Sequence, residues 1–229
     1  MEEKPIIEAR GVYKSFGKAE VIHGIDFTLN KGEFLSVMGP SGSGKSTLLH
    51  CLAGITDIDK GSVVYGGRDM ATFSQKEKTI LRRTDFGFIF QFGELVPELS
   101  IIDNVALPLL LRGVKKKEVY ARSSRWLDEM GISSISHQFP HTISGGEVQR
   151  VATARAMVID PEVIFADEPT GSLDSVNARR IMELFVELVK KYDKSIVLIT
   201  HSDELASYGS RTIRMRDGLI EDSPPAYLL

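Results

Sequence analysis

The chain has 229 residues, of which 42% are hydrophobic, and a formal net charge of -3 at pH 7. This composition supplies a buried core and excludes a disordered chain, and it provides no global positive field that would attract nucleic acid or anionic lipid. The single cysteine, Cys51, excludes an intramolecular disulfide framework and a four-cysteine zinc site, and we expect it to be a buried helical thiol. Because the chain has no global positive field, any polyanion must be bound at a local site.

The first ninety residues alternate between short apolar runs and turns that contain glycine. Such runs predict β-strands, whereas a segment without Gly or Pro that carries leucines at helical spacing predicts a helix. We predict strands at 6–13, 21–29, 34–38, 62–65 and 86–90, and helices at 45–53 and 74–84.

Residues 91–144 differ, because their apolar runs have helical length and rhythm. Between 115 and 130, apolar side chains recur every three or four positions, which places one stripe on a helix. The longest apolar run near mid-chain, 105–111, contains Pro108 and is far shorter than the about 20 residues that a membrane-spanning helix needs. We therefore predict a helical insertion, in a chain that does not itself cross a membrane.

After Ser144 the alternation of strands and helices resumes. The runs at 163–166 and 196–199 are apolar throughout and each precedes a helix, which is typical of a parallel sheet covered on both faces. We predict helices at 147–158 and 175–192, a short helix near Glu204, and strands at 163–167, 195–200, 212–216 and 219–221. The pattern predicts an α/β fold with a mostly parallel sheet.

A phosphate-binding loop is predicted between the strand at 34–38 and the helix that follows. Residues 39–46 match the pattern GxxxxGK[ST], whose glycines let backbone N–H groups approach phosphate oxygens at a helix N-terminus. Lys45 is expected to pair with the β- and γ-phosphates, and the Ser46 hydroxyl to ligate Mg²⁺. The expected nucleotide contacts in this loop are Gly39, Ser41, Gly42, Ser43, Gly44, Lys45, Ser46 and Thr47.

Two carboxylates end the apolar strand at 163–167. In open α/β folds ligands bind at the carboxyl edge of the sheet, and the strand delivers Asp167 to that edge. We expect Asp167 to hold Mg²⁺, either directly or through the water around it. Glu168 is expected to polarise the attacking water as a general base.

Between these two features, Ser144-Gly145-Gly146-Glu147 precedes a predicted helix and forms a second candidate anion site. Here the sequence resembles the nucleotide-binding subunits of ATP-binding-cassette (ABC) transporters, in which this segment looks like the signature motif. The resemblance implies a head-to-tail pair of copies, so that Ser144, Gly145 and Gly146 of one copy close over the γ-phosphate held by the other. It also implies a P-loop NTPase core, an N-terminal antiparallel β subdomain and an inserted helical subdomain.

Four further residues resemble motifs of that family. Tyr13 resembles the aromatic that stacks on adenine, and Gln91 the glutamine that contacts Mg²⁺ and the attacking water. Asp174, in Gly-Ser-Leu-Asp, looks like part of the loop that crosses the dimer interface, and His201 resembles the histidine that senses the γ-phosphate. Each of these residues has a simple structural explanation when it is considered alone. Tyr13 could be an aromatic residue in a strand, Gln91 a surface residue and His201 a histidine at the end of a strand. The motifs occur in the family's order along nearly the whole chain, which favours the family roles.

The resemblance implies one ATPase domain over 1–229, with 1–90 and 145–229 as core and β subdomain and about 91–144 as the helical insertion. It implies ATP and Mg²⁺ as cofactors, and as partners a second copy and an integral membrane permease but no nucleic acid. The segments 88–91, 95–100 and 103–109 resemble the branch serving macrolide efflux, lipoprotein release, haem export and cell division.

The expected function is ATP hydrolysis at the cytoplasmic face of the membrane, as a peripheral subunit. It would power export or extraction of a lipoprotein, drug, peptide or haem. The alternative is an ATPase that regulates cell division or wall remodelling through a membrane partner without moving cargo. Two departures from the family pattern are Glu147, where many members have Gln, and Val148, at a position that is often polar.

Overall fold

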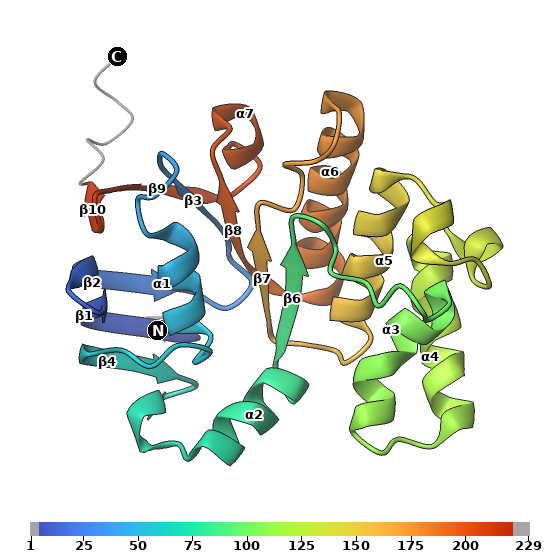
Figure 1. Cartoon of the computed structure of the whole chain (residues 1–229), viewed down its shortest axis with the longest axis horizontal. Coiled ribbons are helices and arrows are strands. Elements are labelled where there is room, and N and C mark those ends of the chain that lie inside the picture. Colours follow the sequence, from blue (N-terminus) through green and yellow to red (C-terminus); the bar gives the residue numbers. More distant parts are fainter. Residues whose placement is uncertain (1–4, 222–229) are drawn as a thin grey trace.

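The computed structural model describes residues 5–221 and contains two sheets (Figure 1). The larger sheet has the order β10-β9-β3-β8-β7-β6, in which all neighbours are parallel except β10 and β9. Its strands are β3 (Phe34–Met38), β6 (Phe86–Phe90), β7 (Val163–Asp167), β8 (Ser195–Thr200), β9 (Arg211–Arg216) and β10 (Leu219–Glu221). The mostly parallel sheet is thereby confirmed, with β3, β7 and β8 buried along almost their whole length.

The smaller sheet is antiparallel, with the order β2-β1-β4-β5. Its strands are β1 (Ile7–Phe16), β2 (Ala19–Leu29), β4 (Lys60–Tyr65) and β5 (Arg68–Asp69). The first strand is predicted to end at residue 13, but it continues to Phe16, because a register shift between Lys14 and Ser15 keeps its irregular end paired with β2. The expected antiparallel β subdomain is confirmed.

Helices cover both faces of the larger sheet. They are α1 (Lys45–Leu52), α2 (Gln75–Thr84), α3 (Ile101–Leu111), α4 (Lys116–Glu129), α5 (Gly145–Met157), α6 (Ser175–Tyr192) and α7 (Asp203–Ala206), with short 3₁₀ helices at Met70–Thr72, Ser133–Ile135 and Pro140–Thr142. α3 continues through Pro108, although proline removes one backbone donor there. The predicted domain 1–229 extends beyond the described residues at both ends, and its division into core and insertion remains our interpretation.

Two hydrophobic cores lie on opposite faces of the larger sheet. Ile164 and Ala166 of β7 pack into the core formed with the helices of the insertion and α6, whereas Val163 and Phe165 pack into the core shared with α1 and the smaller sheet. This alternation follows from the period of two along a strand. Both faces of β7 are thus buried, which leaves its carboxyl end as the place where it meets ligands.

None of the helices between residues 5 and 221 is long and apolar enough to span a bilayer. The strands β6, β7 and β8 all end at the upper edge of the sheet in Figure 1, and α5 begins on the same side. The residues predicted to bind and hydrolyse the nucleotide follow these strand ends.

Candidate active site

The phosphate loop connects β3 to α1 and depends on glycine at its first position. Gly39 has φ 153°, and a Cβ there would lie 2.1 Å from the carbonyl oxygen of Met215. Gly44, with φ 95°, ends the loop as the N-cap of α1. The loop can adopt this path only with residues that lack a side chain at these positions.

Lys45 stabilises the phosphate loop through hydrogen bonds to its backbone. Its side chain is buried, and Nζ donates to the carbonyl oxygens of Gly39 and Pro40 at 2.9 Å each. An ammonium has three donors. The third has no protein acceptor among residues 5–221, so it is available to a phosphate oxygen.

The other loop residues differ in exposure. Ser41 and Gly42 are exposed, whereas Ser43 is 2% exposed and its hydroxyl has no hydrogen-bond partner in the described part of the chain. Ser43 Oγ lies close to Gly39, and Ser43 N donates to the carbonyl oxygen of Pro40 at 3.2 Å, so the nucleotide contact predicted for Ser43 stays a prediction. An exposed glycine-rich loop over a buried ammonium fits a triphosphate.

The candidate metal site joins α1 to the end of β7. Ser46 Oγ donates to Oδ1 of Asp167 at 3.2 Å. Burial raises the pKa of Asp167, and the hydrogen bond from Ser46 opposes this effect. Because water solvates the Asp167 carboxylate only partly, the carboxylate would favour a bound cation. No group of three or more His, Cys, Asp or Glu side chains able to hold a metal occurs within residues 5–221. A hydroxyl and one carboxylate suit Mg²⁺, which is bound largely through phosphates and water.

Glu168 and His201 lie side by side after β7 and β8. His201 Nδ1 is 3.6 Å from Glu168 Oε2. Glu168 N donates to the carbonyl oxygen of Ile199 at 3.0 Å, and its φ of 46° is unusual for a residue other than glycine. The backbone therefore turns at Glu168 in a conformation that is rare for residues other than glycine, and such strain is typical of functional positions.

Gln91, directly after β6, lies against the loop that follows Glu168. A Cβ on Gly171 would lie 2.7 Å from Gln91 Nε2, so the Gln91 side chain packs directly against this glycine. The Gln91 carbonyl oxygen accepts from Ser172 Oγ at 3.2 Å and from Gln149 Nε2 at 2.6 Å. Gln149 also donates to Phe90 at 3.0 Å. Gln149, which the motif comparison missed, is thus the α5 residue that holds Gln91.

Replacing Gln149 by Met keeps its volume but removes one donor from each of two carbonyl oxygens, those of Phe90 and Gln91. Each oxygen keeps a second donor, Gly93 N and Ser172 Oγ respectively. We expect kcat for ATP hydrolysis to fall about tenfold with KM nearly unchanged, because the two lost hydrogen bonds contribute about 1–3 kcal/mol together and hold Gln91 in place. Thr153→Val is the matched control, since Thr153 is equally buried on α5 and bonds only within it. Equal kcat in the two variants would show that Gln149 does not position Gln91.

The signature segment begins α5. Ser144 is its N-cap, and Glu147 closes a capping box by accepting from Ser144 N at 2.8 Å and Ser144 Oγ at 2.7 Å. These hydrogen bonds hold the pKa of Glu147 below its usual value. Glu147 thus fills the N3 position of a capping box, a position that Gln fills as well, so this departure leaves the helix cap intact. Gly145 and Gly146 lie within van der Waals contact of the α6 region, at Leu173 and Asn177.

Asp174 serves its own helix in this structure. Its Oδ1 accepts from the backbone N–H groups of Val176 and Asn177 at 3.0 Å, and Oδ2 accepts from Asn177 Nδ2 at 2.6 Å. These bonds lower its pKa. The predicted role of Asp174 at the nucleotide stays a prediction, and the contacts described here make it the N-cap of α6.

Tyr13 and Phe16 lie on β1 in different surroundings. The Tyr13 hydroxyl covers Gly24, and Lys60 Nζ is 5.6 Å from the ring centre. Phe16 is 53% exposed, and Lys14 Nζ is 5.4 Å from the centre of the Phe16 ring. The charge of Lys14 also lowers the pKa of Cys51, so Lys14 lies on the side of α1. Successive strand side chains face opposite sides. Tyr13 therefore faces away from Lys14, and Phe16 is a second stacking candidate, on the side of α1.

We expect Phe16→Ala to weaken ATP binding about tenfold, because stacking of one base on an aromatic ring contributes about 1–3 kcal/mol. Tyr13→Ala is the matched variant and should change Kd less than about twofold if Phe16 is the platform. Equilibrium binding of ATP and of the triphosphate alone measures both. If Tyr13→Ala weakens ATP binding about tenfold and Phe16→Ala does not, Tyr13 is the residue that stacks on adenine.

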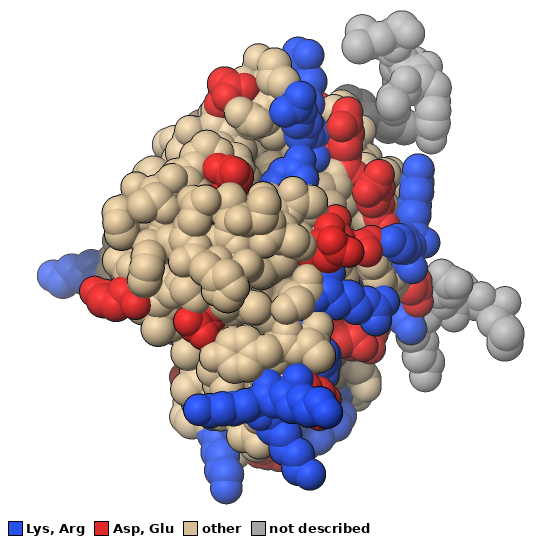
Figure 2. All heavy atoms as spheres, turned by 90° about the vertical axis from the view of Figure 1, so that its right-hand side faces the viewer, with Lys and Arg blue, Asp and Glu red and all other residues tan. Residues whose placement is uncertain are grey.

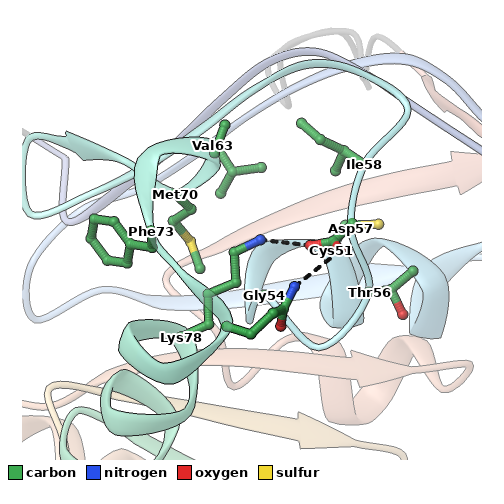
Figure 3. Close-up of a pocket in the computed structure, with 11 residues that line it drawn as sticks. Cys51, Gly54, Thr56, Asp57, Ile58, Val63, Met70, Phe73 and Lys78 are labelled. Carbon is green, nitrogen blue, oxygen red and sulfur yellow. Dashed lines mark hydrogen bonds and ion pairs between the residues drawn. The ribbon is translucent and has the colours of Figure 1, made fainter.

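A cavity of about 350 Å³ lies away from these residues, between the end of α1, β4 and α2 (Figure 3). Lys78 Nζ, its cation, pairs with Asp57 Oδ1 at 2.6 Å. Cys51 contributes a buried thiol, as predicted, and burial raises the pKa of Cys51 to about 11. The charge of Lys78 is already paired with Asp57, and the Cys51 thiol stays protonated, so this cavity does not favour triphosphate binding.

The structure brings together the phosphate loop, Asp167, Glu168, His201 and Gln91 at one sheet edge. The signature segment is elsewhere: α1 and α5 are well separated in Figure 1, with β7 and β6 between them. No hydrogen bond or ion pair between residues 5 and 221 joins Ser144 to the phosphate loop. A single copy thus contains two anion sites that do not meet.

A family model described as ABC transporter matches residues 22–171. The chain belongs to the ABC transporter family. Membership confirms that this ABC subunit is an ATPase that uses ATP and Mg²⁺, and that it works with a second cassette and a membrane-spanning subunit. It favours a transport role over the regulatory alternative.

Relatives of this ABC subunit match over nearly its whole length. The lipoprotein-releasing system ATP-binding protein LolD of Bacteroides thetaiotaomicron is 41% identical, covering 94% of this chain and 99% of the relative. The bacitracin export ATP-binding protein BceA of Halalkalibacterium halodurans is also 41% identical, covering 94% and 87%. The dimeric structure of the bacterial cassette MJ0796 has a TM-score of 0.87 and 34% identity, covering 94% and 97%; a post-hydrolysis dimer of MJ0796 is bound to ADP and Pi.

Proposed function

We propose that ATP hydrolysis occurs in a site built from two copies of this chain. Within one copy, Lys45 holds the phosphates, while Ser46 and Asp167 hold Mg²⁺ with Gln91 beside them. Glu168 orients the attacking water and accepts its proton, and His201, 3.6 Å away, senses the γ-phosphate. Bound Mg²⁺ neutralises charge that develops on the phosphates.

The second copy supplies Ser144, Gly145 and Gly146. The observation that carries this proposal is that one copy has two helix N-termini shaped for anions, at α1 and α5, which do not face each other. Head-to-tail pairing, as in the dimeric MJ0796 relative, would bring them together. Specific ATPase activity of the purified chain should rise with protein concentration in the range where pairs form, and a constant specific activity with no dimer at any concentration would contradict pairing.

We place the membrane subunit at a groove of about 260 Å³ between α2, β6 and α3. Its lining includes Arg82, Arg83, Phe88, Phe90, Pro108 and Leu111. Apolar side chains together with the exposed cation of Arg83 suit a cytoplasmic segment of the permease that carries apolar anchors and a carboxylate. The chain would then lie peripherally on the cytoplasmic face of the membrane.

Arg155 connects this groove to the catalytic loop. It lines the groove, and its guanidinium donates to the carbonyl oxygens of Gly93 and Glu94 at 2.6 Å each. Gly93 and Glu94 follow Gln91 in the same loop, separated from it by one residue, Phe92. A permease segment that moves in the groove would thus shift the Gln91 loop through Arg155.

Arg83 is exposed at the groove and provides the test. Arg83→Glu should abolish co-purification of the membrane subunit from solubilised membranes while the chain alone keeps its ATPase activity. Arg125→Glu, an exposed charge reversal on α4 outside the groove lining, is the matched control. Retention of the membrane subunit by Arg83→Glu would contradict docking in the groove.

The names of the relatives suggest the substrate class. LolD is part of a lipoprotein-releasing system and BceA of bacitracin export, so both act on amphipathic molecules. We propose that the complex extracts or exports an amphipathic lipoprotein or peptide. Identification of the membrane subunit captured through the groove tests this choice.

A further inference from the structure

The loop between α3 and α4 carries a basic tip, which we define as Arg112, Lys115, Lys116 and Lys117. All four side chains are exposed, and none has an ion-pair or hydrogen-bond partner within the described residues. The chain has a net charge of -3, so this is a local concentration of positive charge. Figure 2 shows Lys and Arg gathered at the lower end of this face, where Figure 1 places the loop.

The tip does not stabilise the helix that it precedes. Lys115 is the N-cap of α4 and makes no side-chain cap hydrogen bond, and Lys116 and Lys117 occupy the first turn. Positive charge at a helix N-terminus opposes the helix dipole, and neighbouring like charges repel each other. Local helix stability therefore does not account for the three lysines.

The position of the tip relates it to the membrane subunit. Leu111, which precedes the tip directly, lines the groove and is 62% exposed. In Figure 1 the α3–α4 loop lies at the lower end of the molecule together with α2, away from the upper edge where β6, β7 and β8 end. A permease segment that fills the groove would bring the tip beside the bilayer, so this step rests on the proposed function.

We propose that the basic tip binds the headgroups of anionic phospholipids next to the membrane subunit. The long lysine and arginine side chains reach phosphate groups at the bilayer surface, and exposed Leu111 adds an apolar side chain suited to the interface. Each basic residue near an anionic bilayer increases binding about fivefold. The tip thus provides a second, weaker attachment that aligns the ATPase with the membrane.

An acidic segment of another protein is a different partner for the same charges. The exposed residues lie at a projecting end, and none of the four lines the groove beside Leu111, which fits a flat charged surface better than an extended peptide. The position beside a membrane subunit favours lipid further.

Sedimentation of the purified chain with lipid vesicles tests the proposal. We expect binding to vesicles of phosphatidylcholine with about 30 mol% phosphatidylglycerol, little binding to phosphatidylcholine alone, and release at high salt. Replacing all four tip residues by Gln should reduce the partition coefficient at least tenfold. The matched control replaces Lys18, Arg125, Arg180 and Lys190 by Gln, which removes the same charge from scattered exposed positions without ion pairs among the described residues.

Equal binding of the tip variant and the parent to anionic vesicles would overturn the proposal, as would equal loss in the control, since net charge would then explain binding. If the tip variant keeps vesicle binding but loses the membrane subunit in detergent, the tip recognises protein and the lipid proposal is wrong. Because the tip lies outside the catalytic residues, its variant should keep the parental ATPase rate. Arg83→Glu keeps all four tip residues and should reduce vesicle binding less than their replacement by Gln does, which separates failure of this proposal from failure of groove docking.

Discussion

The variant Glu168→Gln should bind ATP with parental affinity and lose at least about 10²-fold in kcat, because an amide cannot accept the proton of the attacking water. The side chain keeps its size, and the turn at Glu168 depends on backbone bonds to Ile199 and Gly171 that the substitution leaves in place. With hydrolysis blocked, ATP-bound dimers should accumulate, which size-exclusion chromatography with Mg-ATP measures.

Glu162→Gln is the control for this variant. Glu162 precedes β7 on the same segment, at the strand end away from the site, and should leave kcat unchanged. Parental turnover in Glu168→Gln would show that another group acts as the base. A variant that binds ATP normally, stays inactive and remains monomeric would separate the chemical role of Glu168 from the dimer model.

The variant Lys45→Met should weaken ATP binding about 10²-fold, since a charge-assisted hydrogen bond contributes about 1.5–3 kcal/mol and the phosphates lose a buried ammonium. The loss is compounded because Lys45 Nζ also ties down the carbonyl oxygens of Gly39 and Pro40. Titration calorimetry with a non-hydrolysable ATP analogue and Mg²⁺ measures the change.

Lys78→Met is the matched control for Lys45→Met. Lys78 is also a buried lysine, but its charge is paired with Asp57 beside the other cavity. We expect Lys78→Met to lower the melting temperature slightly and to leave ATP affinity within about twofold, because the variant loses an ion pair to an exposed carboxylate, away from the phosphate loop. Equal ATP affinity in Lys45→Met and the parent would exclude Lys45 from phosphate binding.

The elements predicted best from the sequence are those with one dominant signal. The apolar runs of β7 and β8 give correct strands because burial on both faces requires apolar residues at every position. The phosphate loop is equally clear, since glycines with positive φ and a lysine at fixed spacing have few other uses. Boundaries are less exact: α5 begins at Gly145, two residues before the predicted start, because the capping box at Ser144 fixes it.

The site residues that sequence reasoning missed act through three-dimensional contacts. Gln149 holds Gln91 from a helix 58 residues away along the chain, and nothing in its local pattern indicates a bond to β6. Tyr13 was assigned by resemblance, and Phe16, three residues further on, became a second candidate only once the structure showed its exposure and its place beside Lys14. Asp174 was assigned by resemblance, and only the structure shows that its carboxylate caps α6.

The most direct test of the composite site mixes two inactive variants. Lys45→Met destroys the phosphate loop but keeps the signature segment, whereas Ser144→Glu places a carboxylate in the signature segment and keeps the phosphate loop. Each variant alone should be inactive. A mixed pair contains one intact site, so the mixture should regain ATPase activity, up to about half that of the parent when nearly all chains are in mixed pairs and less when pairing is random. A mixture no more active than the sum of its parts, or a Ser144→Glu variant that hydrolyses ATP alone at the parental rate, would contradict the account.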